Sequence, residues 1–307
     1  MSEHHTPVML KESLDLLIVD RSGKYFDATL GFGGHTSEIL KRLNNKGLVV
    51  ASDVDLSAFE YCQKNFQQEV RLNLYNLNYS FIDVIAKVEA IEYFDGILAD
   101  LGVSSYQLDE PAAGFTFRTE AKLDLRMDKT RDISASDILN TFSEEDIANI
   151  LYNYGEEKNS RKIARRIVTK RSINKIDTTN DVVEIISQMV PPPYVKKTLT
   201  RVFQSLRIYV NDELENLKLF LTNSVQVLKK GGRIVIITYH SLEDRIVKDF
   251  FKEESTKELS LKEDPLGIMK KSTRLSIVNK KPIVPSADEL KANYRARSAK
   301  LRAAERI

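Results

Sequence analysis

The chain has 307 residues, 42% of them hydrophobic and 29% charged, and its net charge at pH 7 is +2. It contains no apolar run of about 18 residues that could span a membrane, and Met1 to Pro7 lacks the apolar core of a signal peptide. Its single cysteine, Cys62, excludes an intrachain disulfide and a zinc site built on cysteines. We therefore expect a cytoplasmic globular protein that is long enough for two domains.

The first predicted strand covers Tyr25 to Leu30 and runs into a glycine turn, after which a helix begins near Thr36. Gly31, Gly33 and Gly34 allow the chain to turn sharply, and they leave main-chain N–H groups open to a ligand at the helix N-terminus. This stretch indicates a cradle for a nucleotide-type ligand.

Strands and helices then alternate along the chain. Apolar strands are predicted at 48–52, 70–75 and 94–99, and the segments between them have the apolar spacing of helices. Such an alternation is typical of a parallel sheet that helices cover on both faces. The predicted fold class is α/β, with a doubly wound and mostly parallel sheet.

A long helical segment interrupts this alternation. The next strand is predicted only at 233–238, more than a hundred residues after Asp100, whereas a crossover between parallel strands needs roughly 30 residues. The surplus predicts an inserted helical domain. The predicted boundaries are 1–107 with 205–307 for the sheet domain and 108–204 for the insert.

Local signals mark helix ends around this insert. Ser143 with Asp146 resembles a capping box, and Pro191 to Pro193 are expected to end a helix. A further helix at 212–228 is expected to stop at Lys230 to Gly232, just before the strand.

Basic residues concentrate in two segments. Lys158 to Ile176 holds eight basic residues and no acid, and Met269 to Ile307 holds eleven basic and three acidic ones. The rest of the chain is correspondingly acidic. This asymmetry indicates a polyanion partner, while a solvated helix face is the alternative for either segment alone.

Polar residues follow the predicted strands at the end where ligands bind. In an open parallel sheet, that place is the crevice outside the carboxyl ends of the strands. Four polar groups fall there: Gly31 to His35, Asp53, Asp100, and Tyr239 with His240. Asp53 follows the glycines by about 20 positions, as expected of a carboxylate that binds ribose hydroxyls; its alternative role is to cap the next helix.

The glycine pattern narrows the choice of ligand. The dinucleotide fingerprint G-x-G-x-x-G would require glycine where Thr36 stands, which disfavours an NAD-dependent oxidoreductase. The run GFGGH preceded by Asp27 suits S-adenosylmethionine, which carries an adenosine, a sulfonium and an amino-acid tail but no pyrophosphate.

Asp100 begins the segment DLGVSSYQLD and is a candidate catalytic residue. A carboxylate there could accept a hydrogen bond, and then a proton, from the weakly nucleophilic exocyclic amine of a nucleobase. The alternative is that Asp100 only binds the cofactor.

Cys62 is expected mid-helix as a buried thiol, which disfavours methylation through a cysteine nucleophile and favours transfer to nitrogen or oxygen.

His240 is the second candidate catalytic residue, through contact with substrate. Its alternative role is structural, because Ser241 and Asp244 resemble a capping box that starts a helix there.

The four histidines are dispersed in sequence, and we expect no metal. Phe115 and Phe117 are interpreted as anchors of the insert, with stacking on a flipped base as the alternative.

Several motifs resemble those of the MraW, or RsmH, family of bacterial S-adenosylmethionine-dependent methyltransferases, which modify N4 of a cytosine in the decoding region of 16S ribosomal RNA. The motifs occur in family order from one end of the chain to the other. They are HTPVML (His5 to Leu10), DATLGFGGHT (Asp27 to Thr36), DLGVSSYQLD (Asp100 to Asp109), GFTFR and LDLRMD (Gly114 to Asp128), RVFQSLRIYVNDEL (Arg201 to Leu214), YHSLEDRIVK (Tyr239 to Lys248) and RARSAKLR (Arg295 to Arg302).

The resemblance implies a Rossmann-like class I methyltransferase domain and a helical insert for substrate recognition. It also implies cofactor contacts from Gly33, Gly34, His35, Asp53, Tyr79, Asp100 and Gln107. Two positions depart from the family, because proline is expected where Tyr106 and Tyr294 stand.

The predicted partner is 16S ribosomal RNA or the small ribosomal subunit. The insert and the basic tail are expected to bind its phosphates. A non-catalytic RNA-binding assembly factor is the alternative of another class. No membrane partner is expected, and the oligomeric state, a homodimer included, stays open. The predicted RNA-binding residues are Arg161, Lys162, Arg165, Arg166, Arg295, Arg297 and Lys300.

Overall fold

The computed structural model describes residues 7–104, 107, 114–256 and 272–307. Some residues that the sequence analysis singled out lie outside this part of the chain. They are His4, His5, Tyr106 and the first residues of the basic tail, 269–271.

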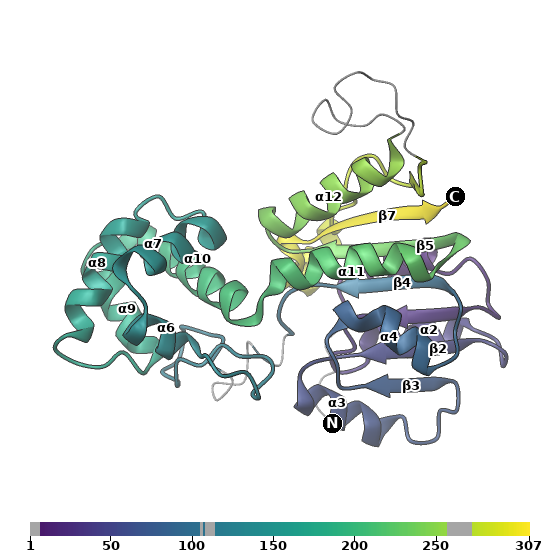
Figure 1. Ribbon diagram of the computed structural model, residues 1–307, viewed down its shortest axis with the longest axis horizontal. Coiled ribbons are helices and arrows are strands. Elements are labelled where there is room, and N and C mark those ends of the chain that lie inside the picture. The colour runs from purple at the N-terminus through teal and green to yellow at the C-terminus, as the bar shows by residue number, and fades with distance from the viewer. Residues whose placement is uncertain (1–6, 105–106, 108–113, 257–271) are drawn as a thin grey trace. The chain divides into compact units, whose positions relative to one another are not determined.

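The chain divides into two compact units (Figure 1). Unit 1 consists of Met1–Gly102 together with Leu214–Ile307, and unit 2 consists of Val103–Glu213. The range predicted for the insert, 108–204, falls inside unit 2. That unit 2 recognises a substrate stays a prediction.

A seven-stranded sheet forms the centre of unit 1, in the order β3-β2-β1-β4-β5-β7-β6. The strands β1 to β5 are parallel to one another, and β7 runs antiparallel to both β5 and β6. The predicted α/β class with a mostly parallel sheet is thus confirmed. The strands are β1 (Lys24–Asp27), β2 (Leu48–Ser52), β3 (Leu72–Tyr75), β4 (Phe94–Asp100), β5 (Leu228–Thr238), β6 (Leu275–Ile277) and β7 (Lys300–Arg306).

Helices cover both faces of this sheet because its strands are apolar on both sides. In β5, Ile234 and Ile236 pack with helices α4, α11 and α12 on one face, while Val235 and Ile237 pack with α1 and α2 on the other. The helical elements of unit 1 are α1 (Leu10–Leu17), α2 (Gly34–Arg42), α3 (Leu56–Asn65), η1 (Tyr79–Phe81), α4 (Ile82–Val88), α11 (Glu213–Val227), α12 (Ser241–Ser255), α13 (Ala287–Ala292) and η3 (Tyr294–Ser298).

The direction of the strand order reverses at β1. The chain leaves β1 through α2 to reach β2 on one side, while β4 pairs with β1 on the other side. The connections after β1 and β4 therefore run apart, which opens a crevice at the carboxyl ends of these strands. Asp27 and Asp100 are the last residues of β1 and β4, so both lie at this edge.

Two predicted boundaries in unit 1 are wrong for the same reason. Glycines were expected to separate elements, but α2 already begins at Gly34, and β5 begins at Leu228 and includes Lys230 to Gly232. The pairing of β5 with β4 shifts between Leu228 and Arg233, so the glycines form a bulge inside the strand.

Unit 2 consists of helices around a separate apolar core. Ser143 caps α7 as predicted, with its Oγ accepting the N–H of Asp146 at 3.0 Å. The prolines were expected to end a helix, yet Pro192 and Pro193 are the first residues of α10, where the missing N–H groups cost nothing. The helices are α6 (Ala135–Thr141), α7 (Glu144–Gly155), α8 (Ser160–Arg171), α9 (Thr179–Ser187) and α10 (Pro192–Asn211).

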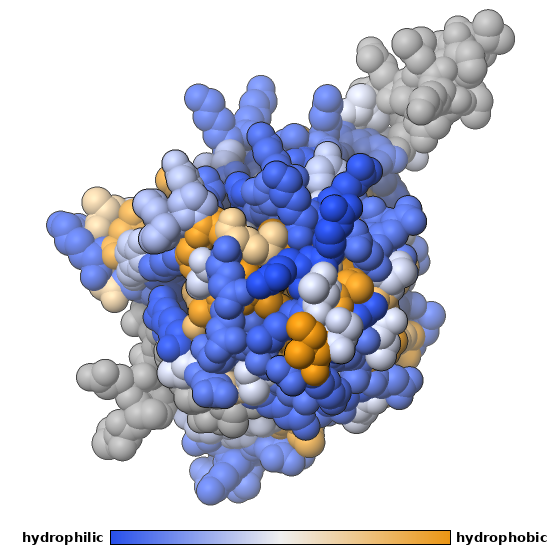
Figure 2. Space-filling view, turned by 90° about the vertical axis from the view of Figure 1, so that its left-hand side faces the viewer, coloured by the Kyte–Doolittle hydropathy of each residue, from blue (hydrophilic) through white to orange (hydrophobic). Residues whose placement is uncertain are grey.

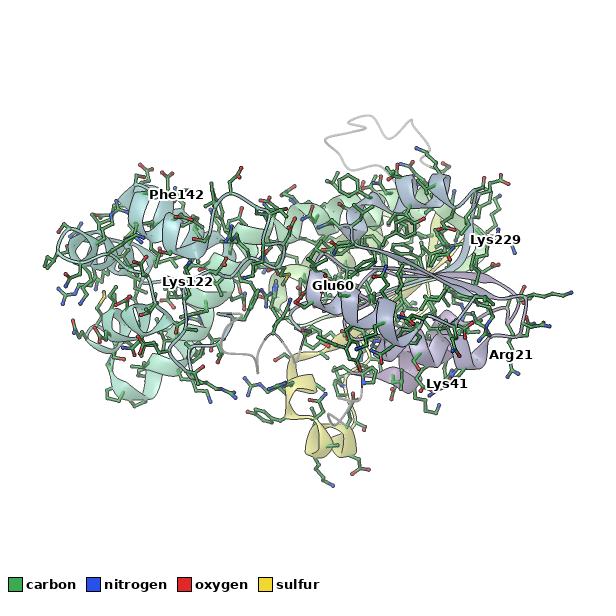
Figure 3. The ribbon with its side chains drawn as sticks, turned by 90° about the horizontal axis from the view of Figure 1, so that it is seen from below. Arg21, Lys41, Glu60, Lys122, Phe142 and Lys229 are labelled. Carbon is green, nitrogen blue, oxygen red and sulfur yellow. The ribbon has the colours of Figure 1, made fainter. Side chains whose placement is uncertain are left out.

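Aromatic contacts and close backbone approach hold α7 against α10. Tyr154 of α7 lies 6.0 Å from Tyr209 of α10 between ring centroids. Phe142, which follows α6 and is labelled in Figure 3, meets the same Tyr209 ring edge to face at 5.8 Å. A Cβ at Gly155 would lie 2.7 Å from the carbonyl oxygen of Arg201. Only glycine therefore lets the end of α7 approach α10 this closely.

Among the described residues, no helix combines the length and apolar character that crossing a bilayer requires.

Replacing Gly155 by Ala should destabilise unit 2, because the added methyl would collide with the backbone of α10 rather than with a flexible side chain. We expect a loss of about 1–3 kcal/mol in the free energy of unfolding, measured by urea denaturation. Asn153→Ala, an exposed change on the same helix, is the control. Equal stability of the two variants would contradict the close approach.

Candidate functional site

The glycine turn after β1 places its main chain beside β2. Gly31 adopts φ 49° and Gly33 φ 80°, both in the left-handed region. A Cβ at Gly33 would lie 2.6 Å from the Phe66 ring, and one at Gly34 would lie 2.6 Å from Pro7. Gly33 and Gly34, predicted as cofactor contacts, are thus required by packing within the chain itself. Beside Gly31 the nearest atom is 4.0 Å away, so that flank of the turn is open.

Asp27 joins the end of β1 to the start of α2. Its side chain is buried, and Oδ2 accepts the hydroxyl of Thr36 at 2.7 Å while Oδ1 accepts the N–H of Thr29 at 3.2 Å. Burial raises the pKa of Asp27, and these hydrogen bonds oppose the rise. In the sequence, Asp27 stands out only as part of a motif. The structure shows that it fixes the direction of α2.

Asp53 follows β2 and is tied to the glycine turn. Its Oδ2 accepts the N–H of Gly31 at 2.7 Å, and its Oδ1 accepts the N–H of Asp55 at 2.9 Å. The alternative role of Asp53 as a helix cap is wrong, because Asp55 caps α3 by accepting the N–H of Ser57. Burial raises the pKa of Asp53 to about 6 despite the two backbone hydrogen bonds. Asp53 is therefore a constrained carboxylate at the predicted place for ribose recognition.

Asp100 ends β4 and is held by residues from three other segments. Its Oδ1 accepts the hydroxyl of Tyr239 at 2.7 Å, and its main-chain N–H donates to Thr29 Oγ1 at 2.7 Å. Its Oδ2 lies 3.8 Å from Nδ1 of His35. Burial raises the pKa of Asp100 to about 6, against the lowering effect of His35 and the Tyr239 hydrogen bond. The structure thus brings together His35, Asp100 and Tyr239 as predicted neighbours at one edge.

His35 is buried in the first turn of α2, and burial lowers its pKa despite the nearby Asp100. It is therefore a neutral imidazole at pH 7. Among the described residues, no side chain or main-chain group forms a hydrogen bond with its Nε2. A buried ring nitrogen without a partner is costly, so it marks a place where a ligand would supply the missing hydrogen bond.

His240 begins α12, and the predicted capping box is shifted by one residue. The N-terminal cap is His240 with Glu243, rather than Ser241 with Asp244. Nε2 of His240 lies 3.1 Å from Oε1 of the buried Glu243. The structural role of His240 is therefore established, and its contact with substrate stays a prediction.

The two remaining predicted cofactor residues lie in different units. Tyr79 belongs to η1 in unit 1, where its ring meets Phe220 edge to face at 5.0 Å between centroids. Gln107 belongs to unit 2, is buried, and exchanges hydrogen bonds of 3.1 Å with Ser104. Their cofactor contacts stay predictions.

The predicted RNA-binding residues of unit 2 lie on α8. Arg165 is 3.5 Å from Glu144, and Arg166 donates to the side chain of Gln188 at 2.7 Å. Arg161 and Lys162 are exposed. The face of the protein seen in Figure 2, on which helices of unit 2 lie, is mainly hydrophilic with small groups of apolar side chains.

The predicted RNA-binding residues of unit 1 lie in η3 and β7. The guanidinium of Arg297 stacks 4.6 Å from the ring centroid of Tyr294, which is exposed. Lys300 is partly buried and forms an ion pair of 3.0 Å with Asp244, so part of its charge is already balanced. Arg295 is partly buried in η3.

The acids at this edge favour a cationic ligand. Asp27 raises the pKa of both Asp53 and Asp100, which means that its ionised carboxylate repels each of the other two. A sulfonium or ammonium group would relieve that repulsion. The open flank of Gly31, these carboxylates and the Nε2 of His35, which has no hydrogen-bond partner among the described residues, together fit a cationic ligand.

The fold is that of an α/β protein with a mostly parallel sheet and polar groups at the carboxyl ends of its strands. Sequence comparison identifies its family. Residues 2–307 match the MraW methylase family, so the chain belongs to it. This confirms the family resemblance and S-adenosylmethionine as the methyl donor.

The chain is also similar to proteins named ribosomal RNA small subunit methyltransferase H. That from Fusobacterium nucleatum subsp. nucleatum is 44% identical over 100% of this chain and 98% of its own length, and that from Clostridium botulinum strain Kyoto is 44% identical over 100% of both. A crystal structure of an rRNA methylase from Streptococcus thermophilus covers 97% of this chain and 93% of its own with 11% identity and a TM-score of 0.41. This last match adds nothing to the family assignment.

The affinity for S-adenosylmethionine should rise between pH 5 and pH 7 as the ionised carboxylates attract the cation, because Asp53 and Asp100 hold their protons up to about pH 6. The same shifts reduce folding stability over the rise from about pH 4 to pH 6, since the native state binds these protons more tightly than the unfolded chain does. Isothermal titration across this pH range measures the affinity. In Asp53→Asn the rise should be smaller; an unchanged profile would contradict the assignment.

Proposed function

We propose that this protein transfers the methyl group of S-adenosylmethionine to the exocyclic N4 of a cytosine in the decoding region of 16S ribosomal RNA. The similar proteins named above act, by their names, on the RNA of the small ribosomal subunit. The observation that carries the proposal is Asp100, a carboxylate fixed by Tyr239 at the end of β4. The resemblance to the cytosine-N4 methyltransferases supports the choice of atom.

In this proposal the residues of the edge hold the cofactor and the amine. S-adenosylmethionine supplies an electrophilic methyl group when bound. Asp53 is oriented by Gly31 and Asp55, and its remaining lone pairs accept the ribose hydroxyls. Neutral His35 provides Nε2 to the bound ligand without adding a positive charge beside the sulfonium.

Asp100 would accept a hydrogen bond from the exocyclic amine and later its proton. The nitrogen lone pair is delocalised into the ring, so drawing the N–H toward a carboxylate favours the pyramidal nitrogen that attacks the methyl carbon. A pKa of about 6 leaves Asp100 mostly ionised at pH 7, yet basic enough to take a proton from the product cation. The Tyr239 hydroxyl keeps one oxygen of Asp100 engaged and leaves the other for the amine.

The single cysteine supports transfer to nitrogen rather than to carbon 5 of the base. Cys62 is buried, its Sγ donates to the carbonyl of Gly31 at 3.3 Å, and burial raises its pKa to about 12. A thiol with such a pKa is not a nucleophile at pH 7. A covalent cysteine adduct on the base is therefore unavailable to this chain.

Basic residues of both units are the proposed contacts with the RNA. The basic residues of α8, η3 and β7 would bind phosphates, and the salt dependence of binding would reflect how many they contact. A protein that methylates the small subunit would act in ribosome biogenesis and rRNA processing, and we propose that it does so in the cytoplasm.

Incubation with radiolabelled S-adenosylmethionine and small ribosomal subunits should place label on one cytosine of 16S RNA, located by nuclease mapping and mass spectrometry. Naked 16S RNA in a parallel reaction shows which form is the substrate. RNA binding without any transfer of label would support the assembly-factor alternative and remove the enzymatic proposal.

Replacing Asp100 by Asn should reduce kcat by about a hundredfold or more, because an amide cannot take the proton of the amine. Titration of S-adenosylmethionine separates the two roles of this residue. If the variant binds the cofactor normally and turns over slowly, Asp100 acts on the amine. If only cofactor affinity falls, Asp100 is a cofactor ligand alone. Asp288→Asn, an exposed change on α13, is the control.

A further inference from the structure

Unit 2 contains a cavity of about 430 Å³ that the function above does not use. Its volume lies within the range of roughly 300–1,000 Å³ typical of ligand sites. The cavity lies between the start of α8, the segment that follows α9 and the first turns of α10. Its lining includes four basic residues (Lys158, Lys162, Lys197, Arg201) and four apolar or aromatic ones (Met189, Val190, Pro191, Tyr194).

The segment that follows α7 lines part of this cavity. Glu156 takes the left-handed conformation that ends α7, and Glu157, the next residue, lines the cavity. Glu157 is buried; its Oε1 accepts the N–H of Asn159 at 2.9 Å, and its Oε2 lies 3.3 Å from Nη1 of Arg201. The Arg201 guanidinium is thus held in place by a buried carboxylate.

The cavity carries a net positive charge. Among the described residues that line it, Glu157 is the only acid, and it is already paired with Arg201. Within the described chain, Lys158, Lys162 and Lys197 form no ion pair and are exposed, so their charges are available to an anion. Two helix N-termini add to this potential, because neither Asn159 before α8 nor Pro191 before α10 caps its helix with a side chain.

An exposed aromatic ring stands beside these cations. The side chain of Tyr194 is 61% exposed although it belongs to a well-packed helix. Lys197 and Arg201 follow it by three and seven positions, so all three lie along one side of α10. A ring next to lysines offers a stacking surface for a base and counter-charges for a phosphate.

We propose that this cavity binds one nucleotide of single-stranded substrate RNA, with its base on Tyr194 and its phosphate at Lys158, Lys162 and Lys197. The inference rests on the proposed function for the identity of the RNA. The bound nucleotide is not the methylated cytosine, because no carboxylate in the cavity is free to accept a proton from its amine. Lys162 was predicted from the charge of α8, whereas Lys197, Arg201 and Tyr194 were not.

Neighbouring lysines on α10 provide a matched test. Lys197 lines the cavity, and Lys196 is equally exposed but does not line it. Fluorescence anisotropy with a labelled single-stranded RNA oligonucleotide should show weaker binding by Lys197→Ala, about fivefold, and a plot of log K against log salt that is shallower by about 0.7. Lys196→Ala should match the wild type. Equal behaviour of the two variants would overturn the proposal.

The aromatic contact has its own pair of variants. Tyr194→Leu should weaken oligonucleotide binding by about fivefold or more, whereas Tyr194→Phe keeps the stacking surface and should bind normally. Circular dichroism and urea unfolding verify that each variant keeps its fold. If Phe and Leu at this position bind alike, the base does not stack on Tyr194.

Two further measurements separate this proposal from the proposed function. On small subunits, Lys197→Ala should raise KM with kcat and S-adenosylmethionine affinity unchanged. Suppose that the wild type methylates subunits, but Lys197→Ala and Lys196→Ala have the same oligonucleotide affinity and the same KM. Only the cavity proposal then fails. If the wild type methylates nothing, the proposed function fails and the anisotropy still decides the cavity. Cytidine monophosphate that binds as tightly as the oligonucleotide would show that the ligand is a free nucleotide and would overturn the RNA assignment.

Discussion

The arrangement of residues at the carboxyl ends of β1, β2 and β4 depends on the buried carboxylate of Asp27. A buried acid is costly unless it is hydrogen-bonded, and Asp27 meets this requirement through Thr29 and the Thr36 hydroxyl. These contacts fix the start of α2 against the end of β1. The turn between them then places the Gly31 N–H on Asp53 and the His35 ring near Asp100. One inaccessible side chain thus sets the positions of groups on three strands.

Burial at this edge also determines the chemistry that the residues can perform. Asp53 and Asp100 remain partly protonated near pH 6, while His35 is kept neutral. A site with several carboxylates and no added positive charge suits a cationic methyl donor. The same environment makes Cys62 inert, because its thiol loses the solvent that would stabilise a thiolate.

Features governed by short-range patterns were predictable from the sequence. Continuous apolar strands predict the parallel sheet. The common edge of its strand ends predicts that Asp53 and Asp100 lie near each other, and Asp27 raises the pKa of both. Features that depend on distant partners were not. The sequence of β7 contains charged residues and therefore lacks the apolar pattern of a strand. Lys300 and Arg302 can lie in this strand because both pair with Asp244, more than fifty residues earlier in the chain. The cap at His240 depends on the rotamer of Glu243, which spacing alone does not reveal.

The place of β7 in the sheet has a consequence for synthesis of the protein. This strand lies between β5 and β6, and its residues, 300–306, leave the ribosome after all others in the sheet. Unit 2 is continuous in sequence, so its helices can pack while unit 1 still lacks a strand. Until then β5 exposes one unpaired edge. The helical unit of the nascent chain can therefore fold before the sheet of unit 1 is complete.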